Sequence, residues 1–203
     1  KIRVHIHAND PSEVFRVAAR FGTGAGEKAD DMQRQQHSAH STDRRVAIVT
    51  DSAADIPEAE LDRLDIHMIP VRVHFGARSY LDKVGITSDE FYAEIERGTE
   101  PPKTSQPPPG DFRRQFEFLG SHHSAVISIN LTSRVSGTCA AAQTAAARTA
   151  THGKVSVIDT GNVSAGQGLI AMYAAECAAA GYDVARIVAA TKAILPRTRS
   201  FGV

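Results

Sequence analysis

The chain has 203 residues, 42% hydrophobic and 23% charged, which is the composition of an ordinary globular protein of about one domain. Lys plus Arg and Asp plus Glu number 23 each, and this balance argues against a surface for nucleic acid or anionic membranes. No apolar run approaches membrane-spanning length and no signal-peptide pattern is present, so we expect a cytoplasmic protein without a transmembrane segment. Cys139 and Cys177 lie in alanine-rich helical stretches, which favours buried free thiols over a disulfide framework.

The first 35 residues predict a small β-α unit. Residues 2–6 alternate as Ile-Arg-Val-His-Ile, a strand pattern that places His5 and His7 on one face. A turn at 9–12 then begins a helix that ends near Gly22. The unit is too small to bury its own core, and the missing initiator Met suggests a fragment of something longer. The polar stretch 36–44 predicts a linker, after which a second domain covers 45–203.

Strands and helices alternate through this second domain. Strands are expected at 46–50, 125–129 and 155–158, and one or two strands bent at Pro70 are expected at 66–75. Helices are expected from Pro57 to 64, from a capping box at 87–90 to 98, around the stripe Phe112, Phe116 and Leu119, and at 138–151, 163–179 and 183–195. The predicted fold class is therefore α/β, a mostly parallel sheet with helices on both faces, preceded by the small β-α remnant.

Three of the predicted strands end in polar turns: Asp51-Ser52, Asn130 to Ser136, and Asp159-Thr160-Gly161. If the strands are parallel, these turns lie along one edge of the sheet. Ligands of open parallel sheets bind beyond that edge. The sequence therefore predicts a binding site there, and it leaves the role of Asp51 open.

The turn from Asn130 to Thr138 is rich in hydroxyl groups and leads into a helix. Ser136 can act as the N-cap, and the amides of Gly137 and Thr138 then face a helix end that attracts carboxylate or phosphate. For a lone serine the cap alone is the favoured interpretation. Its coincidence with two further polar strand ends favours a ligand. The proline-rich stretch 101–110 displays Thr104 and Ser105 on a stiff loop.

Other motifs have simpler interpretations. Asp51 and Asp55 invite a phosphatase or metal function, but Asp55 before Ile56-Pro57 is better explained as a helix N-cap. Gly161, Gly166 and Gly168 do not match a nucleotide-binding spacing, and close helix packing explains them better. No G-x-S-x-G elbow accompanies the serines, so a hydrolase ranks below a binding protein. His5 and His7 are spaced to share a metal ion, although exposed strand histidines are the commoner explanation.

From Arg45 onward the chain resembles the DegV family of fatty-acid-binding proteins. The resemblance rests on four motifs in order: 49–57 (Val-Thr-Asp-Ser-Ala-Ala-Asp-Ile-Pro), 104–107 (Thr-Ser-Gln-Pro), 133–138 (Ser-Arg-Val-Ser-Gly-Thr) and 159–168. Residues 4–11 and 31–35 resemble the C-terminal end of the dihydroxyacetone-kinase-like subunit of bacterial fatty acid kinase. The chain is thus similar to part of a fusion of kinase subunit and fatty-acid carrier.

This resemblance implies a carrier that buries a long-chain fatty acid while a kinase domain, in cis or in trans, phosphorylates its carboxylate. The implied head-group ligands are Thr104 and Ser136, with Ser105, Ser133, Gly137, Asp51 and Ser52 as neighbours. No cofactor is expected in the lipid-binding domain. The kinase resemblance associates the His5 and His7 strand with zinc.

The sequence departs from the family at Cys139, where an aromatic residue is usual, and at Pro108-Pro109. A second half, with further head-group contacts, is expected after Val203, and a nucleotide-binding domain before Lys1. We expect no phosphorylation by this fragment alone. The alternatives are a serine-dependent hydrolase of lipid or acyl esters and an inert scaffold fragment.

Overall fold

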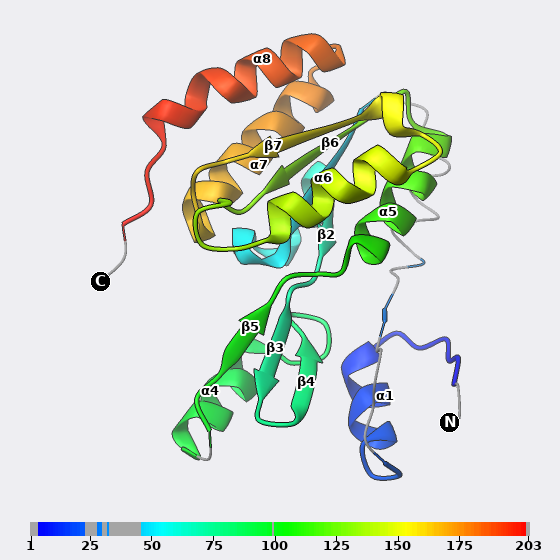
Figure 1. The fold of residues 1–203 in the computed structure, drawn as a ribbon, viewed down its shortest axis with the longest axis vertical. Helices are drawn as coiled ribbons and strands as arrows, with labels where there is room; N and C mark the ends of the chain where they lie inside the picture. The colour runs from blue at the N-terminus through cyan, green and yellow to red at the C-terminus, as the bar shows by residue number, and fades with distance from the viewer. Residues whose placement is uncertain (1–3, 23–27, 30–31, 33–45, 99, 202–203) are drawn as a thin grey trace. The chain divides into compact units, whose positions relative to one another are not determined.

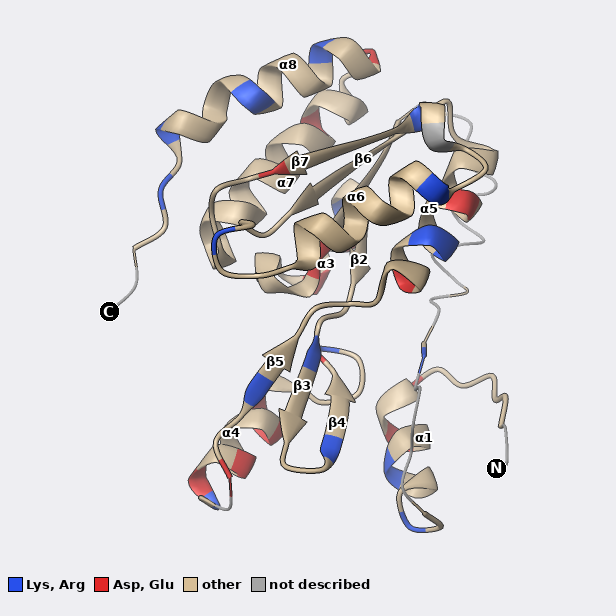
Figure 2. Cartoon of the chain, in the orientation of Figure 1, with Lys and Arg blue, Asp and Glu red and all other residues tan. Residues whose placement is uncertain are grey.

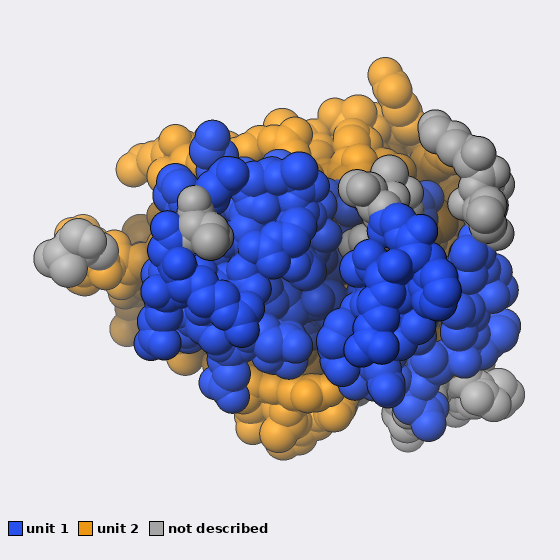
Figure 3. Space-filling model, turned by 90° about the horizontal axis from the view of Figure 1, so that it is seen from below, with its two compact units in different colours: residues 1–30, 70–105 blue, residues 31–69, 106–203 orange. Residues whose placement is uncertain are grey.

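The structure is a computed structural model, and it describes residues 4–22, 28–29, 32, 46–98 and 100–201. The chain divides into two compact units, which are coloured separately in Figure 3. One unit contains 1–30 and 70–105, and the other contains 31–69 and 106–203. The predicted boundaries at 35 and 45 and the predicted linker lie outside the described residues, so the division into remnant, linker and carrier stays a prediction.

The larger unit is built on a parallel sheet of four strands (Figure 1). The spatial order is β2-β1-β6-β7, with bounds Ile66–Ile69, Val46–Asp51, Ala125–Asn130 and Val155–Asp159. Each neighbouring pair is parallel. β1 and β6 are buried along their whole length, as expected for apolar strands covered on both faces. The predicted α/β class is confirmed.

Helices cover both faces of this sheet (Figure 1). Alternate residues of β1 point to opposite sides, so Val46 and Ile48 join the core cluster that contains residues of α7, while Ala47 and Val49 join the cluster of α5 and α6. The helices are α3 (Glu58–Leu64), α5 (Pro109–His122), α6 (Thr138–Arg148), α7 (Ser164–Ala179) and α8 (Val184–Ile194). Short 3-10 turns occupy η1 (Ser52–Ala54), η2 (His152–Lys154) and η3 (Leu195–Arg197).

Several predicted core features are confirmed. Phe112, Phe116 and Leu119 form the fully buried stripe of α5. Cys139 and Cys177 are free and buried. Burial raises the pKa of the Cys139 thiol to about 11, so this thiol stays protonated and unreactive at neutral pH. Within the described ranges, every helix is too short or too polar to cross a membrane.

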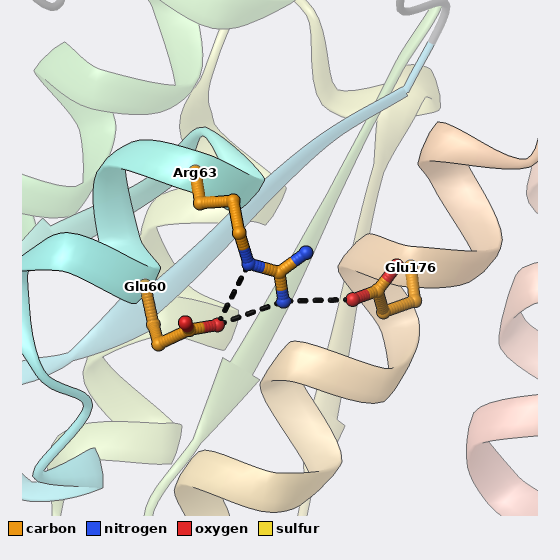
Figure 4. Close-up of polar contacts among 3 residues, drawn as sticks. All are labelled: Glu60, Arg63 and Glu176. Carbon is orange, nitrogen blue, oxygen red and sulfur yellow. Dashed lines mark hydrogen bonds and ion pairs between the residues drawn. The ribbon is translucent and has the colours of Figure 1, made fainter.

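An exposed ion-pair network connects α3 to α7 (Figure 4). The Arg63 guanidinium donates to Glu60 at 2.7 Å and to Glu176 at 2.8 Å. The hydrogen bond from Arg63 lowers the pKa of Glu60. Because all three side chains remain in contact with solvent, the network fixes the relative position of the helices more than it adds stability.

The smaller unit contains an antiparallel sheet in the order β4-β3-β5. Its strands are β3 (Arg72–Phe75), β4 (Arg78–Leu81) and β5 (Lys103–Ser105), and α4 (Ser88–Glu96) follows the hairpin. Val73, Phe75 and Ile86 form a small core with Tyr80 and Phe91. The predicted capping box is confirmed, because Thr87 accepts the Glu90 N–H and Glu90 accepts the Thr87 N–H.

Two local predictions were wrong. Residues 4–6 belong to no strand, and the helix that follows, α1 (Pro11–Ala18), buries no residue, because the alternating pattern finds no neighbouring strand among the described residues. Asp55 is not an N-cap: it ends η1 in the left-handed conformation with φ 50°, and α3 begins after Pro57. The stretch 66–75, expected as one or two strands, forms two, β2 and β3, which are divided at Pro70 and belong to different sheets.

The glycines near the start of α7 allow close packing, as the sequence predicted. A Cβ on Gly168 would collide with the backbone carbonyl oxygen of Ala54 and lie 3.2 Å from Ile56 Cγ1. A Cβ on Gly166 would collide with Ser200 Oγ, and Ser200 accepts the Val163 N–H and donates to the Val163 carbonyl. Both glycines therefore serve packing against the chain itself.

We predict that Gly168→Ala destabilises the fold by roughly 1–3 kcal/mol, because the backbone of η1 must move to admit the methyl group. Gly110→Ala is the matched control in a helix, since nothing lies within 4 Å of its Cβ position. That variant should be neutral or slightly stabilising. Chemical denaturation of the three proteins measures the difference, and equal stability of both variants would contradict the packing explanation.

Candidate functional site

The candidate site lies where the strand order of the parallel sheet reverses. The connection from β1 runs through α3 to β2 on one side, and the connection from β6 runs through α6 to β7 on the other. β1 and β6 are nevertheless neighbours, with Thr50 opposite Ile129. Such a reversal leaves a crevice beyond the carboxyl ends of the two strands, which is the usual ligand position in this class of sheet.

The ends of β1, β6 and β7 come together at this edge, as predicted. Most of the sheet is tan in Figure 2, the colour of residues other than Lys, Arg, Asp and Glu, and Asp51 and Asp159 are the only Asp, Glu, Lys or Arg residues within the four strands. Each is the last residue of its strand, and Asn130 lies between them at the end of β6. The two carboxyl groups have different surroundings and different pKa shifts.

Asp51 is completely buried and joins β1 to the turn after β6. Its Oδ2 accepts the Leu131 N–H at 3.0 Å and Asn130 Nδ2 at 3.1 Å. Desolvation raises the pKa of Asp51, and the nearby amides of Leu131, Gln167 and Asn130 offset only part of this rise. Asp51 therefore fixes the start of the serine-containing turn from below, and its neighbour Ser52 is also buried.

Two buried oxygen atoms beside this contact have no hydrogen-bond donor among the described residues. Gln167 donates through Nε2 to Thr50 Oγ1 at 3.1 Å, and Thr50 in turn donates to the Ile129 carbonyl. Gln167 Oε1 and Asp51 Oδ1 have no partner of ordinary hydrogen-bond geometry among the described residues, although Gln167 lies close enough to influence the Asp51 pKa. A proton on Asp51 would supply a donor in a place that otherwise contains only acceptors.

Asp159 is half-buried and holds the other side of the turn. Its carboxylate accepts the Ser133 N–H at 3.2 Å and the Gly161 N–H at 2.9 Å. Burial acts to raise its pKa, but hydrogen bonds from the Ser133 side chain and these amides outweigh it, so the pKa is lowered. Ser133 is thus occupied by an internal carboxylate rather than left free for a ligand.

The loop after β7 adds further hydrogen bonds to the same turn. Thr160 donates its N–H and its hydroxyl to the Asn130 carbonyl, and the Thr132 N–H donates to the Asn162 carbonyl. Asn162 also donates through its side chain to the carbonyl groups of Thr160 and Thr198. The base of the turn is therefore held by hydrogen bonds from both neighbouring strand ends.

Ser136 is the half-buried hydroxyl at the start of α6. The prediction that it caps this helix was wrong in detail, because the N-cap residue is Gly137. The Ser136 hydroxyl still accepts the Thr138 N–H at 3.2 Å, and it lies 2.9 Å from Thr138 Oγ1. If the buried Thr138 hydroxyl donates to Ser136, the proton of Ser136 is free for another acceptor.

Gln106 contacts this turn, and the sequence did not identify it as a site residue. Its side chain lies against Gly137, where a Cβ would be 2.7 Å from Gln106 Cδ and 3.0 Å from Nε2. The signal was present, since Gln106 belongs to the same Thr-Ser-Gln-Pro motif as Thr104. Without the fold, nothing in the sequence paired residue 106 with residue 137.

Thr104 and Ser105 belong to the smaller unit, on strand β5. Both are exposed, and Thr104 pairs with Val73 of β3. Ser105 Oγ lies 2.8 Å from Nε2 of His74 on the same sheet.

His5 and His7 are exposed, with ring centroids 4.9 Å apart. Across the described part of the chain, no group of three or more His, Cys, Asp or Glu residues is arranged to hold a metal ion. Zinc sites in proteins use at least three protein ligands. The described residues therefore offer no third ligand for a zinc ion at His5 and His7.

Comparison with known proteins agrees with this geometry. Residues 45–203 match the family model described as "Uncharacterised protein, DegV family". A DegV domain-containing protein of Caldanaerobacter subterraneus subsp. tengcongensis is 35% identical over 159 residues, which are 78% of this chain and 56% of that protein.

Two similar solved structures carry titles that state a ligand class. One is a DegV family protein from Thermus thermophilus, titled for fatty acid binding, with a TM-score of 0.70 and 30% identity over 75% of this chain and 54% of that one. The other is DegV from Bacillus subtilis, titled a fatty acid binding protein, with a TM-score of 0.70 and 33% identity over the same shares. The chain thus spans about half the length of these relatives.

We predict that Asp51→Asn stabilises the protein at neutral pH, on the order of 1 kcal/mol, because the new amide supplies a donor where two buried acceptors lack one. The pKa of Asp51 is raised in the folded state, so the folded chain keeps this proton after the unfolded chain releases it near 3.8. Wild-type stability should therefore fall as pH rises above 3.8, whereas Asn does not titrate. The advantage of the variant should grow with pH.

Thermal unfolding of both proteins between pH 4 and 8 measures this trend. Asp89→Asn, at an exposed aspartate of α4, is the control and should show no such growth. A variant less stable than wild type at every pH would mean that the ionised Asp51 carboxylate supports the fold.

Proposed function

The chain belongs to the DegV family, and from this membership we propose that it binds a long-chain fatty acid. The fatty-acid binding stated for the relatives from Thermus thermophilus and Bacillus subtilis supports this ligand class. The observation that carries the proposal is the position of the Ser136 hydroxyl, at the N-terminus of α6 and beside the reversal of strand order.

We propose that the carboxylate of the fatty acid binds at this turn. Ser136 donates its hydroxyl proton to the ligand, with the Gly137 amide beside it at the positive end of α6. Ser133 holds the turn through Asp159, and the buried Asp51 and Ser52 position it from beneath. Thr104 and Ser105 are proposed as head-group ligands from the resemblance of their Thr-Ser-Gln-Pro motif to the family.

The hydrocarbon tail supplies most of the affinity in this proposal. Each buried methylene contributes about 0.8 kcal/mol, so a long chain outweighs the few hydrogen bonds of its head group. The polar groups at the turn instead select the ligand, because an unpaired carboxylate is costly to remove from water. The matched segment covers only 54% of each of these two relatives, so the proposal assigns the full tail-binding pocket to the whole protein.

We further propose that the bound carboxylate is presented to a fatty acid kinase domain, in cis or in trans. In that reaction a carboxylate oxygen attacks the terminal phosphorus of a nucleoside triphosphate. The bond from that phosphorus to the bridging oxygen breaks, the nucleoside diphosphate leaves, and an acyl phosphate forms. Resemblance of residues 4–11 and 31–35 to a kinase subunit supports the partner. Zinc at His5 and His7 belongs to the same proposal and requires ligands from other parts of that partner.

The serine hydrolase alternative is not favoured. Among the described residues, no histidine is hydrogen-bonded to Ser133 or Ser136. Ser105 does contact His74, but no described carboxylate is paired with that imidazole. A nucleophilic serine needs both a base and a group that orients the base.

We predict that Ser136→Ala weakens fatty-acid binding about 10–100-fold, the range expected for losing a hydrogen bond to a charged group. Thr144→Ala, an exposed position two turns into the same helix, should bind as wild type does. Displacement of a fluorescent fatty acid by stearic acid, in a chain that includes the expected second half, measures the affinities. Ester hydrolysis by wild type that disappears in Ser136→Ala would favour the hydrolase instead.

We also predict that Thr104→Val weakens stearic acid binding, by about tenfold, because valine has the shape of threonine without its hydroxyl donor. Ser88→Ala, at the exposed first residue of α4 in the same unit, is its control. Wild-type affinity in Thr104→Val would remove Thr104 from the head-group set.

A further inference from the structure

The backbone conformation of Gly137 does not require a glycine. Its φ and ψ are −78° and 4°, which side-chain-bearing residues adopt readily. The described glycines that do need conformational freedom, such as Gly161 with φ 63°, have positive φ. The absence of a side chain at 137 therefore has another cause, and the atoms that occupy the space identify it.

Those atoms are the carboxamide of Gln106. The three heavy atoms nearest to a Cβ on Gly137 are Oε1, Cδ and Nε2 of Gln106, with Cδ at 2.7 Å. Both residues belong to the larger unit. The glycine thus provides the space in which the Gln106 carboxamide lies against the turn, next to Ser136.

The Gln106 carboxamide has unused hydrogen-bonding capacity. Gln106 is exposed, and its side chain makes no hydrogen bond within the part of the chain that the structure describes. A glutamine amide offers two N–H donors. By contrast, Ser133 is bound to Asp159 and Ser136 is oriented by Thr138, so the turn by itself offers a carboxylate few free donors.

The charge balance at the edge also favours a further donor. Asp159 is an ionised carboxylate at the Ser133 side of the turn, with its pKa lowered by hydrogen bonds from Ser133 and Gly161 that outweigh its desolvation. Arg134 lies close enough to lower the Asp159 pKa and balances part of this charge, and a second carboxylate is attracted toward the start of α6, where Ser136 and Gly137 lie. The Gln106 carboxamide is on this α6 side.

We infer that Gln106 is a further head-group ligand, donating through its carboxamide to the fatty-acid carboxylate beside Ser136, and that Gly137 is a glycine to admit it. The inference rests on the proposed function and adds to it a residue that selects for charge. Neither the tail nor the hydrophobic core distinguishes a fatty acid from a fatty alcohol, whereas this contact does.

The test replaces the amide by a carboxylate of the same shape. Gln106→Glu should weaken binding of stearic acid about tenfold or more at low salt, because two negative charges then meet, while binding of stearyl alcohol changes little. The charge-dependent loss should shrink as salt is added, since Gln106 is exposed. Gln143→Glu makes the same chemical change at an exposed position of α6 and is the matched control.

A second variant tests the coupling to the glycine. Gly137→Ala forces the Gln106 side chain away from the turn, so in that background Gln106→Glu should have a much smaller effect on stearic acid affinity. Circular dichroism checks that each variant is folded.

The outcomes separate the inference from the proposed function. If wild type binds neither stearic acid nor stearyl alcohol, the proposed function is wrong and the inference is lost with it. Suppose instead that wild type binds stearic acid, and that Gln106→Glu weakens the binding of stearic acid and stearyl alcohol equally or leaves both unchanged. Gln106 is then only a packing residue, and the inference alone is overturned.

Discussion

The hydrogen bond from the Leu131 amide to the buried Asp51 carboxyl is the contact on which the candidate site depends. It crosses from β6 to β1 at the place where the strand order reverses. Parallel strands alone do not determine where the chain goes after it leaves the sheet. Asp51 fixes that direction by binding Leu131 and Asn130 together, and the following turn then delivers Ser136 and Gly137 to the start of α6.

The pKa values of the two aspartates at this edge are shifted in opposite directions because their surroundings differ. Asp51 is fully desolvated and its pKa is raised, whereas Asp159 receives enough hydrogen bonds for its pKa to be lowered. Asp159, on the side of Ser133, is therefore the more readily ionised of the two, and Arg134 lies close enough to lower its pKa further. The N-terminus of α6 is a favourable place for an incoming anion, because it is the positive end of a helix whose only charged residue, Arg148, lies at the far end.

The sequence predicted the parts of the fold that follow from local patterns. The apolar runs at 46–50 and 125–129 can only be buried strands, and their polar ends had to meet once the strands were parallel. The sequence did not predict contacts between distant segments. Serine is a preferred N-cap residue, yet the N-cap of α6 is Gly137 and not Ser136. A strand was expected at residues 2–6, but residues 4–6 have no strand to pair with among the described residues. Asp51 appeared equally suited to a ligand and to a structural role, and only its complete burial reveals the hydrogen bonds it makes inside.

Glycine illustrates why such contacts escape a reading of the sequence. Atoms of another segment occupy the space where a Cβ would lie on each of three glycines. They are the Ala54 carbonyl at Gly168, Ser200 at Gly166 and Gln106 at Gly137, and each partner is more than 30 residues away in the sequence. The first two partners are tied into the fold, so those glycines serve packing alone. Gln106 differs because its carboxamide is exposed and makes no hydrogen bond to the described residues. A space kept for a polar group without a partner in the described part of the chain is better explained by a ligand than by stability, since an exposed side chain against a glycine adds little to the core.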